Sequence, residues 1–347
     1  MCRGFVILVL FLCNLHSAWA QWEQQSSGVD VQLRGISAVS HKIAWASGAK
    51  GTVLRTLDAG QHWEKLNVAG AEALDFRDIQ AFNDKTAFVL SIGPGEQSRI
   101  YKTADGGQHW QLQFTNHAPK AFYDCFAFWD RKHGIALSDS VDGAFPLLST
   151  SNGKNWATVH PSSMPPALPN EGAFAASGTC ITVDPRHNDA WFVTGGPAAR
   201  VFHSPDRGHS WTAVNSPVLS GAPSQGIFSI TFWGLNFQSG MIVGGDYQAP
   251  KSTEKNAATT QDGGKTWELV SKGPSGYRSA VASIPDTGPA RLVAVGTSGS
   301  DYSLDGGKTW QTLDTEDYNA VSFASPTAGW AVGPKGRIAR FTQLPQK

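Results

Sequence analysis

The sequence predicts an all-β protein, folded as a seven-bladed β-propeller in which each blade is a four-stranded antiparallel sheet. A short motif, Ser/Thr-x-Asp-x-Gly-x-x-Trp, recurs along the chain, and the tryptophans that end successive copies lie 43 to 56 residues apart. That spacing is typical of propeller blades. The chain contains 37 glycines and 13 tryptophans, while only 16% of its residues are charged. Such a composition favours short strands joined by many turns.

The recurring motif is interpreted as a hairpin turn with an aromatic anchor. An Asp in a tight turn accepts hydrogen bonds from backbone N–H groups just downstream, and the Gly allows a positive φ. The Trp then begins the next strand with a large apolar surface to bury. We therefore expect a structural role for these residues. The five complete copies contain Asp58 and Trp63, Asp105 and Trp110, Asp206 and Trp211, Asp262 and Trp267, and Asp305 and Trp310.

A sixth copy of the motif is degenerate, and the last repeat has none. The copy that ends at Trp156 has Ser151 at the Asp position, and we expect Asn152 to replace it. In the first repeat, alternating apolar runs predict strands at 31–39, 42–46, 52–56 and 63–66. The last repeat offers only three runs, at 318–323, 329–332 and 337–341. We expect residues 21–24 to supply its fourth strand, which closes the ring and removes exposed sheet edges.

The first twenty residues resemble a secretory leader. Arg3 is basic, residues 5–13 are apolar, and Ala18-Trp19-Ala20 is a cleavage site of the A-x-A type. The apolar run is too short for a membrane helix. We therefore expect a signal peptide at 1–20, a single propeller domain at 21–347, and export to the periplasm or medium without a stable membrane anchor.

Charge and cysteine content narrow the partners and the compartment. The chain has 28 basic and 28 acidic side chains and no basic run, which argues against nucleic acid as a partner. Cys125 and Cys180 fall at the same inner-strand position of neighbouring repeats, where other repeats have Ile36 and Ile79. An oxidising compartment permits a bridge between them. The expected separation is slightly too long for good disulfide geometry, so buried free thiols are the favoured prediction.

A binding site is expected where the repeat is interrupted, because loops on a rigid scaffold carry function. Insertions occur at 138–144, 161–171 and 246–259. In an up-and-down propeller, the loop between the second and third strands of a blade opens on the face where the inner strands begin. The two longest of these loops therefore share that face with the first residues of the inner strands. The inner strands begin at Arg34, Arg77, Tyr123, Gly178, Phe228, Arg278 and Asn319, and the nearby loop residues include Asp124, Asp139, Asp142, Glu171, Asp246 and Tyr247.

Two interpretations of this channel-mouth cluster remain open. In one, the predicted binding residues are Arg34, Arg77, Tyr123, Asp124, Arg278 and Tyr247, and the guanidinium groups recognise a carboxylate or an acidic segment of a partner. In the other, these charges neutralise one another as a solvated lining.

An enzymatic alternative also stays open at this face. A glycosidase needs two carboxylates roughly 5–10 Å apart, and Asp139, Glu171 and Asp246 are the candidates. A sialidase would also use an arginine triad and a tyrosine, which Arg34, Arg77, Arg278 and Tyr123 offer, but the chain lacks an Arg-Ile-Pro segment. No metal-ligand spacing, dinucleotide fingerprint or serine elbow is found, so no cofactor or metal is expected.

The repeated motifs resemble the Asp boxes of the bacterial neuraminidase repeat, and the mature chain looks like the photosystem II stability/assembly factor-like propellers within that superfamily. The likeness rests on the boxes ending at Trp63, Trp110, Trp211, Trp267 and Trp310, on segments such as Ile43–Ala46, and on the last repeat without a box. It implies a non-catalytic exported scaffold that binds a protein partner, with a basic patch at Arg34, Arg77 and Arg278. We predict that function, with a carbohydrate-active hydrolase as the alternative.

Overall fold

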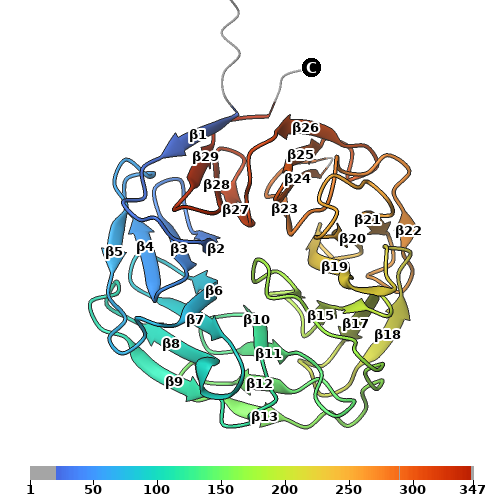
Figure 1. Cartoon of the computed structure of the whole chain (residues 1–347), viewed down its shortest axis with the longest axis horizontal. Helices are drawn as coiled ribbons and strands as arrows, with labels where there is room; N and C mark the ends of the chain where they lie inside the picture. Colours follow the sequence, from blue (N-terminus) through green and yellow to red (C-terminus); the bar gives the residue numbers. More distant parts are fainter. Residues whose placement is uncertain (1–20, 289, 345–347) are drawn as a thin grey trace, which may run out of the picture.

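The computed structural model describes residues 21–288 and 290–344, and its strands form seven antiparallel sheets arranged as a ring (Figure 1). The prediction of a seven-bladed propeller is confirmed. The expected leader at 1–20 lies outside the described residues. Within the described part of the chain, no helix is long and apolar enough to cross a membrane; the helical element there is the short 3-10 turn η1 (Gly95–Gln97).

Strands follow one another outwards from the channel in each of the first three blades, in chain order. They are β2 (Leu33–Ala38), β3 (Ala44–Gly48), β4 (Thr52–Thr56) and β5 (Glu64–Leu66) in blade 1; β6 (Asp75–Ala81), β7 (Ala87–Ile92), β8 (Arg99–Thr103) and β9 (Gln111–Thr115) in blade 2; and β10 (Tyr123–Phe128), β11 (Gly134–Ser138), β12 (Leu147–Thr150) and β13 (Ala157–Val159) in blade 3.

The next three blades repeat this order, and blade 5 carries one extra inner strand, β16 (Gly195–Gly196), paired with β19. Their strands are β14 (Ile181–Val183), β15 (Ala190–Val193), β17 (Arg200–Ser204) and β18 (Thr212–Asn215) in blade 4; β19 (Ala222–Trp233), β20 (Ser239–Asp246), β21 (Ala257–Thr260) and β22 (Glu268–Leu269) in blade 5; and β23 (Ala280–Ile284), β24 (Arg291–Gly296), β25 (Gly299–Ser303) and β26 (Gln311–Asp314) in blade 6.

The seventh blade joins the two ends of the chain, as the sequence predicts. β27 (Ala320–Ser325), β28 (Ala328–Val332) and β29 (Ile338–Phe341) are completed by β1 (Trp22–Gln25), which lies on the outer edge of β29 (Figure 1). The pairing runs from Trp22 opposite Phe341 to Gln25 opposite Ile338. The Gln25 side chain accepts hydrogen bonds from the indoles of Trp63 and Trp330, so β1 also ties blade 7 to blade 1.

The Asp boxes are turns of the kind that the motif predicts. In the first box, the Thr56 hydroxyl accepts the N–H of Gly60 at 2.8 Å, and Asp58 accepts the N–H of His62 at 2.9 Å. The same bonds recur in the other complete boxes, for example from Gly307 to Ser303. In the degenerate copy, Asn152 replaces the Asp and accepts two backbone N–H groups. The side chains of each box therefore provide the hydrogen-bond acceptors for the backbone N–H groups of its own turn.

The two cysteines form a disulfide, so the prediction of free thiols is wrong. The Cα atoms of Cys125 and Cys180 lie 6.1 Å apart, within the range that a disulfide spans. The alignment of the repeats in the sequence is one residue out in blade 3. Strand register places Cys125 opposite Leu137, where Asp78 stands opposite Leu90 in blade 2, one residue before Ile79. Cys125 and Cys180 are therefore close enough on neighbouring inner strands for their thiols to bond.

Loss of this disulfide is expected to destabilise the propeller measurably. The bond closes a loop between residues 55 apart in the sequence. A cross-link of that kind contributes roughly 2–4 kcal/mol, chiefly by restricting the unfolded chain. We expect a Cys125→Ala/Cys180→Ala variant to lose that amount in urea unfolding at equilibrium. Wild-type protein unfolded in reductant should match the variant, and equal midpoints for the oxidised wild type and the variant would contradict the prediction.

Candidate functional site

A shared bulge in the inner strands builds the channel mouth. In blades 1, 2, 3 and 5, one residue is skipped in the register between the first two strands, at the end of the inner strand nearest the channel mouth: Arg34, Arg77, Asp124 and Phe228. A bulged residue is re-aimed relative to its strand, and bulges are common beside functional sites. These four residues, here called the rim, surround the place where the channel opens.

The channel mouth is filled by the protein's own residues 172–179, here called the plug. The plug precedes Cys180 and reaches into the centre of the ring, where Figure 1 shows it in yellow-green. Arg34 donates to the carbonyl of Ala176 at 3.2 Å, and Arg77 donates to that of Ala175 at 3.0 Å. The ring of Phe174 stacks on Phe228 with centroids 3.8 Å apart. Three rim residues therefore contact the plug directly.

The base of the plug is bonded to the inner strands of blades 5 and 6. The Ser177 hydroxyl donates to the carbonyl of Ser279 at 2.9 Å, and the Thr179 hydroxyl lies 2.6 Å from that of Ser229. Gly178 has a φ of +78°, and a Cβ there would meet the carboxylate of Asp78. The plug thus joins blade 4 to blades 1, 2, 5 and 6.

Arg34 and Arg77 differ in how their charges are balanced. Arg77 pairs with Asp75 at 2.9 Å. Arg34 forms no ion pair with any described residue, and its Nε is buried without a hydrogen-bond partner. Burial lowers the pKa of Arg34, and neighbouring Arg77 lowers it further. One oxygen each of Asp75 and Asp317 is also buried and without a partner. The interpretation of a neutralised lining therefore holds for Arg77, whereas Arg34 is influenced by the charges of Asp75 and Asp317 without forming an ion pair with either.

Two carboxyl groups lie beneath the plug on the blade 3 side. Asp139 accepts the N–H of Ala173 at 2.8 Å. Burial raises the pKa of Asp139 to about 6. Burial also raises the pKa of Asp124 well above its usual range, and the nearby Asp139 adds to that rise, while the N–H of Ala175 opposes it. Both acids therefore resist ionisation where the plug backbone passes them.

The raised pKa of Asp139 predicts a pH-dependent stability. A carboxyl whose pKa is higher in the folded state stabilises the fold fully below its unfolded pKa, and that stabilisation is lost as the pH rises through about 6. Relative to the wild type, Asp139→Asn should therefore gain roughly 2–3 kcal/mol between pH 4 and pH 8. Urea unfolding at each pH measures this difference, with exposed Asp142→Asn as control. Parallel stability curves for Asp139→Asn and wild type would show that the carboxyl titrates normally.

The structure corrects two of the predicted mouth residues. Tyr123 precedes the bulge and is buried against Phe114, so Asp124 occupies the rim position instead. Burial raises the pKa of the Tyr123 phenol to about 12. Arg278 is wholly buried inside blade 6, where its Nε donates to Asp301 at 2.6 Å. Arg278 lies two residues before β23, whose register has no bulge to turn it toward the channel.

The three carboxylates considered for a glycosidase are engaged separately. Glu171 is buried and forms a two-point ion pair with Arg200, and it also accepts bonds from Thr194 and from the N–H of Leu168. Asp246 accepts bonds from Gln225 and the N–H of Gln248. Of the three carboxylates, Asp139 is therefore the one that lies beside the rim.

The two other residues expected near the mouth lie at its exposed edge. Tyr247 is 46% exposed and meets Phe228 edge-on. Asp142 pairs with Lys120, and both side chains are largely exposed. Among the described residues, no group of three His, Cys, Asp or Glu side chains could hold a metal ion.

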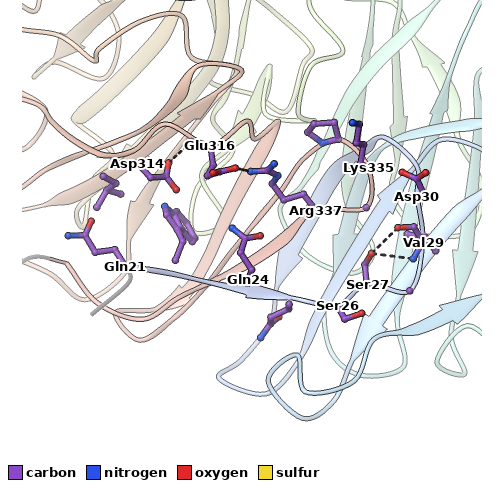
Figure 2. Close-up of a pocket in the computed structure, with 16 residues that line it drawn as sticks. Gln21, Gln24, Ser26, Ser27, Val29, Asp30, Asp314, Glu316, Lys335 and Arg337 are labelled. Carbon is purple, nitrogen blue, oxygen red and sulfur yellow. Dashed lines mark hydrogen bonds and ion pairs between the residues drawn. The ribbon is translucent and has the colours of Figure 1, made fainter. Parts of the chain in front are cut away.

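Two further hollows adjoin the ring. Beyond the plug, the channel continues as a well of about 390 Å³, lined by the inner strands of all seven blades, with Ser177–Thr179 as its floor. A groove of about 920 Å³ lies at the seam where β1 closes the ring (Figure 2). Its charged residues include Arg337, which pairs with Glu316, and Asp314, which accepts a bond from Ser300. The groove therefore holds three acidic and two basic side chains.

Sequence reasoning missed the plug, although one feature pointed to it. The link from blade 3 to blade 4 comprises residues 160–180, whereas the corresponding links are 67–74 and 116–122. The sequence pattern predicts an insertion at 161–171 and an inner strand that begins at Gly178. The strand begins at Ile181, and the residues before it fill the channel.

Comparisons with known proteins agree with the repeat pattern. Residues 14–163 match the family model described as photosynthesis system II assembly factor YCF48, and residues 301–312 match that of the BNR/Asp-box repeat. The resemblance inferred from the motifs is confirmed. Among curated proteins, no sequence matches the chain.

Solved structures share the fold at low sequence identity. One described as YCF48 bound to D1 peptide is 17% identical, with a TM-score of 0.66, over 94% of this chain and 98% of that one. YCF48 from Cyanidioschyzon merolae is 18% identical, with a TM-score of 0.63, over 93% and 99%. An ancestral GH74 enzyme is 15% identical, with a TM-score of 0.62, over 92% of this chain and 46% of that one. At such identities the likeness shows the fold alone.

Proposed function

We propose that this chain is an exported, non-catalytic propeller that binds a protein partner at the channel mouth, where Arg34 and Arg77 receive a carboxylate or an acidic segment. The observation that carries the proposal is that the Arg34 guanidinium contacts no carboxylate of a described residue directly. Its guanidinium is half-buried, has no ion-pair partner among the described residues, and keeps Nε without an acceptor. A buried charge without a partner costs free energy, and a carboxylate would relieve that cost through paired, charge-assisted hydrogen bonds.

The comparisons support a protein partner. The matched family model describes an assembly factor, and one structure of the same fold is described as bound to a peptide. The engaged state of Glu171 and Asp246 favours binding over hydrolysis, because a glycosidase must keep both of its carboxyl groups free to react.

Export is part of the proposal and is supported by the disulfide. A bridge between Cys125 and Cys180 is favoured in an oxidising compartment. We expect the purified mature protein to begin at Gln21 and to fractionate with the periplasm or the medium. N-terminal sequencing of the native protein tests this, and retention of Met1 in the cytoplasm would contradict it.

Affinity capture from the periplasmic extract of the host tests the binding surface. We expect Arg34→Gln/Arg77→Gln to reduce capture of a specific partner at least tenfold, since removing one side of a buried charge pair at an interface costs about 2–5 kcal/mol. The matched control is Arg291→Gln/Lys308→Gln, which removes the same charge from exposed positions in blade 6, away from the channel mouth. Equal capture by both double variants would overturn the proposed site.

A panel of aryl glycosides, including a sialoside, tests the hydrolase alternative directly. We expect no release of the aryl group by the wild type. Release that is lost in Asp139→Asn would overturn the non-catalytic assignment.

A further inference from the structure

The plug is held in the way that a protein holds a peptide ligand. Its contacts at the mouth use backbone groups: the N–H of Ala173 donates to Asp139, and the carbonyls of Ala175 and Ala176 accept from Arg77 and Arg34. Only one side chain of the segment is recognised at this level, the ring of Phe174 on Phe228. Backbone bonds combined with one aromatic pocket are a common mode of peptide recognition.

The pocket sets strict limits on side-chain size after the aromatic residue. Ala175 and Ala176 are 8% and 7% exposed, and Ala176 packs with Phe228 and Tyr277 in one small apolar cluster. Larger side chains at these two positions would have to displace their neighbours. The mouth therefore fits an extended segment that presents an aromatic residue followed by two small ones.

The plug is also longer than the connection requires, and its ends are suited to a hinge. Residues 160–180 join blade 3 to blade 4, whereas the shorter segment 116–122 is enough to join blade 2 to blade 3. Gly172 and Gly178 flank the buried residues, and Gly178 already has a φ of +78°. The disulfide at Cys180 fixes the chain just beyond. Residues 173–177 could therefore leave the mouth while the inner strand stays in place.

We infer that the plug is an internal competitor: it occupies a peptide site that a partner enters with an extended segment of the same chemistry, an aromatic residue followed by two small residues. This inference rests on the proposed function, since it places the partner at the same mouth. It adds the class of ligand and a built-in restraint. A partner that displaces the plug replaces the plug's contacts with equivalent ones, so it gains little free energy and binds weakly. Its binding becomes stronger when the plug is loosened or when the partner also places a carboxylate against Arg34.

A synthetic peptide with the sequence of residues 171–178, Glu-Gly-Ala-Phe-Ala-Ala-Ser-Gly, is the probe. Fluorescence anisotropy of the labelled peptide is measured with full-length mature wild type and with Phe174→Ser, which removes the stacked ring from the plug but leaves the rim intact. A second variant replaces residues 173–177 with Gly-Ser-Gly-Ser-Gly. We expect both variants to bind the peptide at least tenfold more tightly than the wild type, and a peptide with Ser in place of Phe to bind neither.

Three outcomes decide the inference. Adding Phe228→Leu to Phe174→Ser should abolish peptide binding, because the stacking partner is lost while an apolar side chain remains. No gain in peptide binding by either variant, with the cooperative melt retained, overturns the inference. Loss of the cooperative melt in both variants also overturns it, since the plug would then be an integral part of the core. If Arg34-dependent capture of a partner persists in either case, the proposed function stands without the competitor.

Discussion

Removal of residues 21–28 is expected to abolish cooperative thermal unfolding, since the last blade would lose its outer strand. β1 pairs with β29 along its whole length, and Trp22 is 6% exposed between Tyr318 and Phe341. Truncating a buried Trp alone costs about 3–5 kcal/mol. The deletion also removes Gln25, the hydrogen-bond partner of two indoles. Together these losses rival the whole stability of a typical domain, about 5–15 kcal/mol.

Point variants of the same strand separate closure from a general effect of the N-terminus. Trp22→Ala should lower the free energy of unfolding by about 3–5 kcal/mol. Glu23→Ala, on the exposed face of the same strand, should change it by less than about 0.5 kcal/mol. Calorimetry of chains beginning at residue 21 and at residue 29 gives the measurement. A truncated chain that melts like the intact one would mean that the ring is stable with an open seventh blade.

The fold could be predicted because its determinants are local and repeated. The hydrogen bonds that stabilise each Asp-box turn join residues two to four apart, such as Asp58 and His62. The turn can therefore be recognised from the local sequence alone. The orphan fourth strand at the N-terminus was recognisable because Trp22 takes the place that Trp63 has in the first repeat. The number of blades, and the closure of the ring by the N-terminal strand, could be inferred by counting the repeats and the strands in each.

The mouth could be predicted only in part, because its geometry depends on a one-residue bulge. The sequence predicts Arg34 and Arg77 correctly as mouth residues, but the register shows that their equivalent in blade 3 is Asp124 and not Tyr123. A single-residue slip of register moves a side chain to the other face of a strand. The disulfide was missed for the same reason. Such a slip cannot be recognised from the alternation of apolar and polar residues in the sequence.

The plug was beyond prediction for a different physical reason. Residues 172–179 have neither a repeat nor an alternating pattern, and their position depends on contacts with five other blades. The Pro-rich stretch before them reads as an ordinary surface loop. The length of the connection shows that it contains extra residues. Their position in the channel depends on the folded ring and is not encoded in the local sequence.

The second large effect is expected at Arg278, and it concerns stability rather than binding. Its guanidinium is fully buried and donates to Asp301, to the carbonyl of Tyr277 and to the hydroxyls of Ser275 and Ser298. Arg278→Ala leaves Asp301 buried without its counter-charge, and breaking such a pair costs about 3–5 kcal/mol. Urea unfolding should therefore show a large loss of stability.

The matched control in the same blade is Arg291→Ala, which removes an exposed arginine at the start of β24 and should shift stability by less than about 0.5 kcal/mol. A double variant, Arg278→Met/Asp301→Leu, removes both charges and should recover much of the lost stability, because an apolar pair needs no compensation for buried charge. At a temperature where Arg278→Ala remains folded, it should capture the partner as well as the wild type does. Loss of capture by the folded Arg278→Ala protein would instead assign this arginine to the binding surface, which its burial argues against.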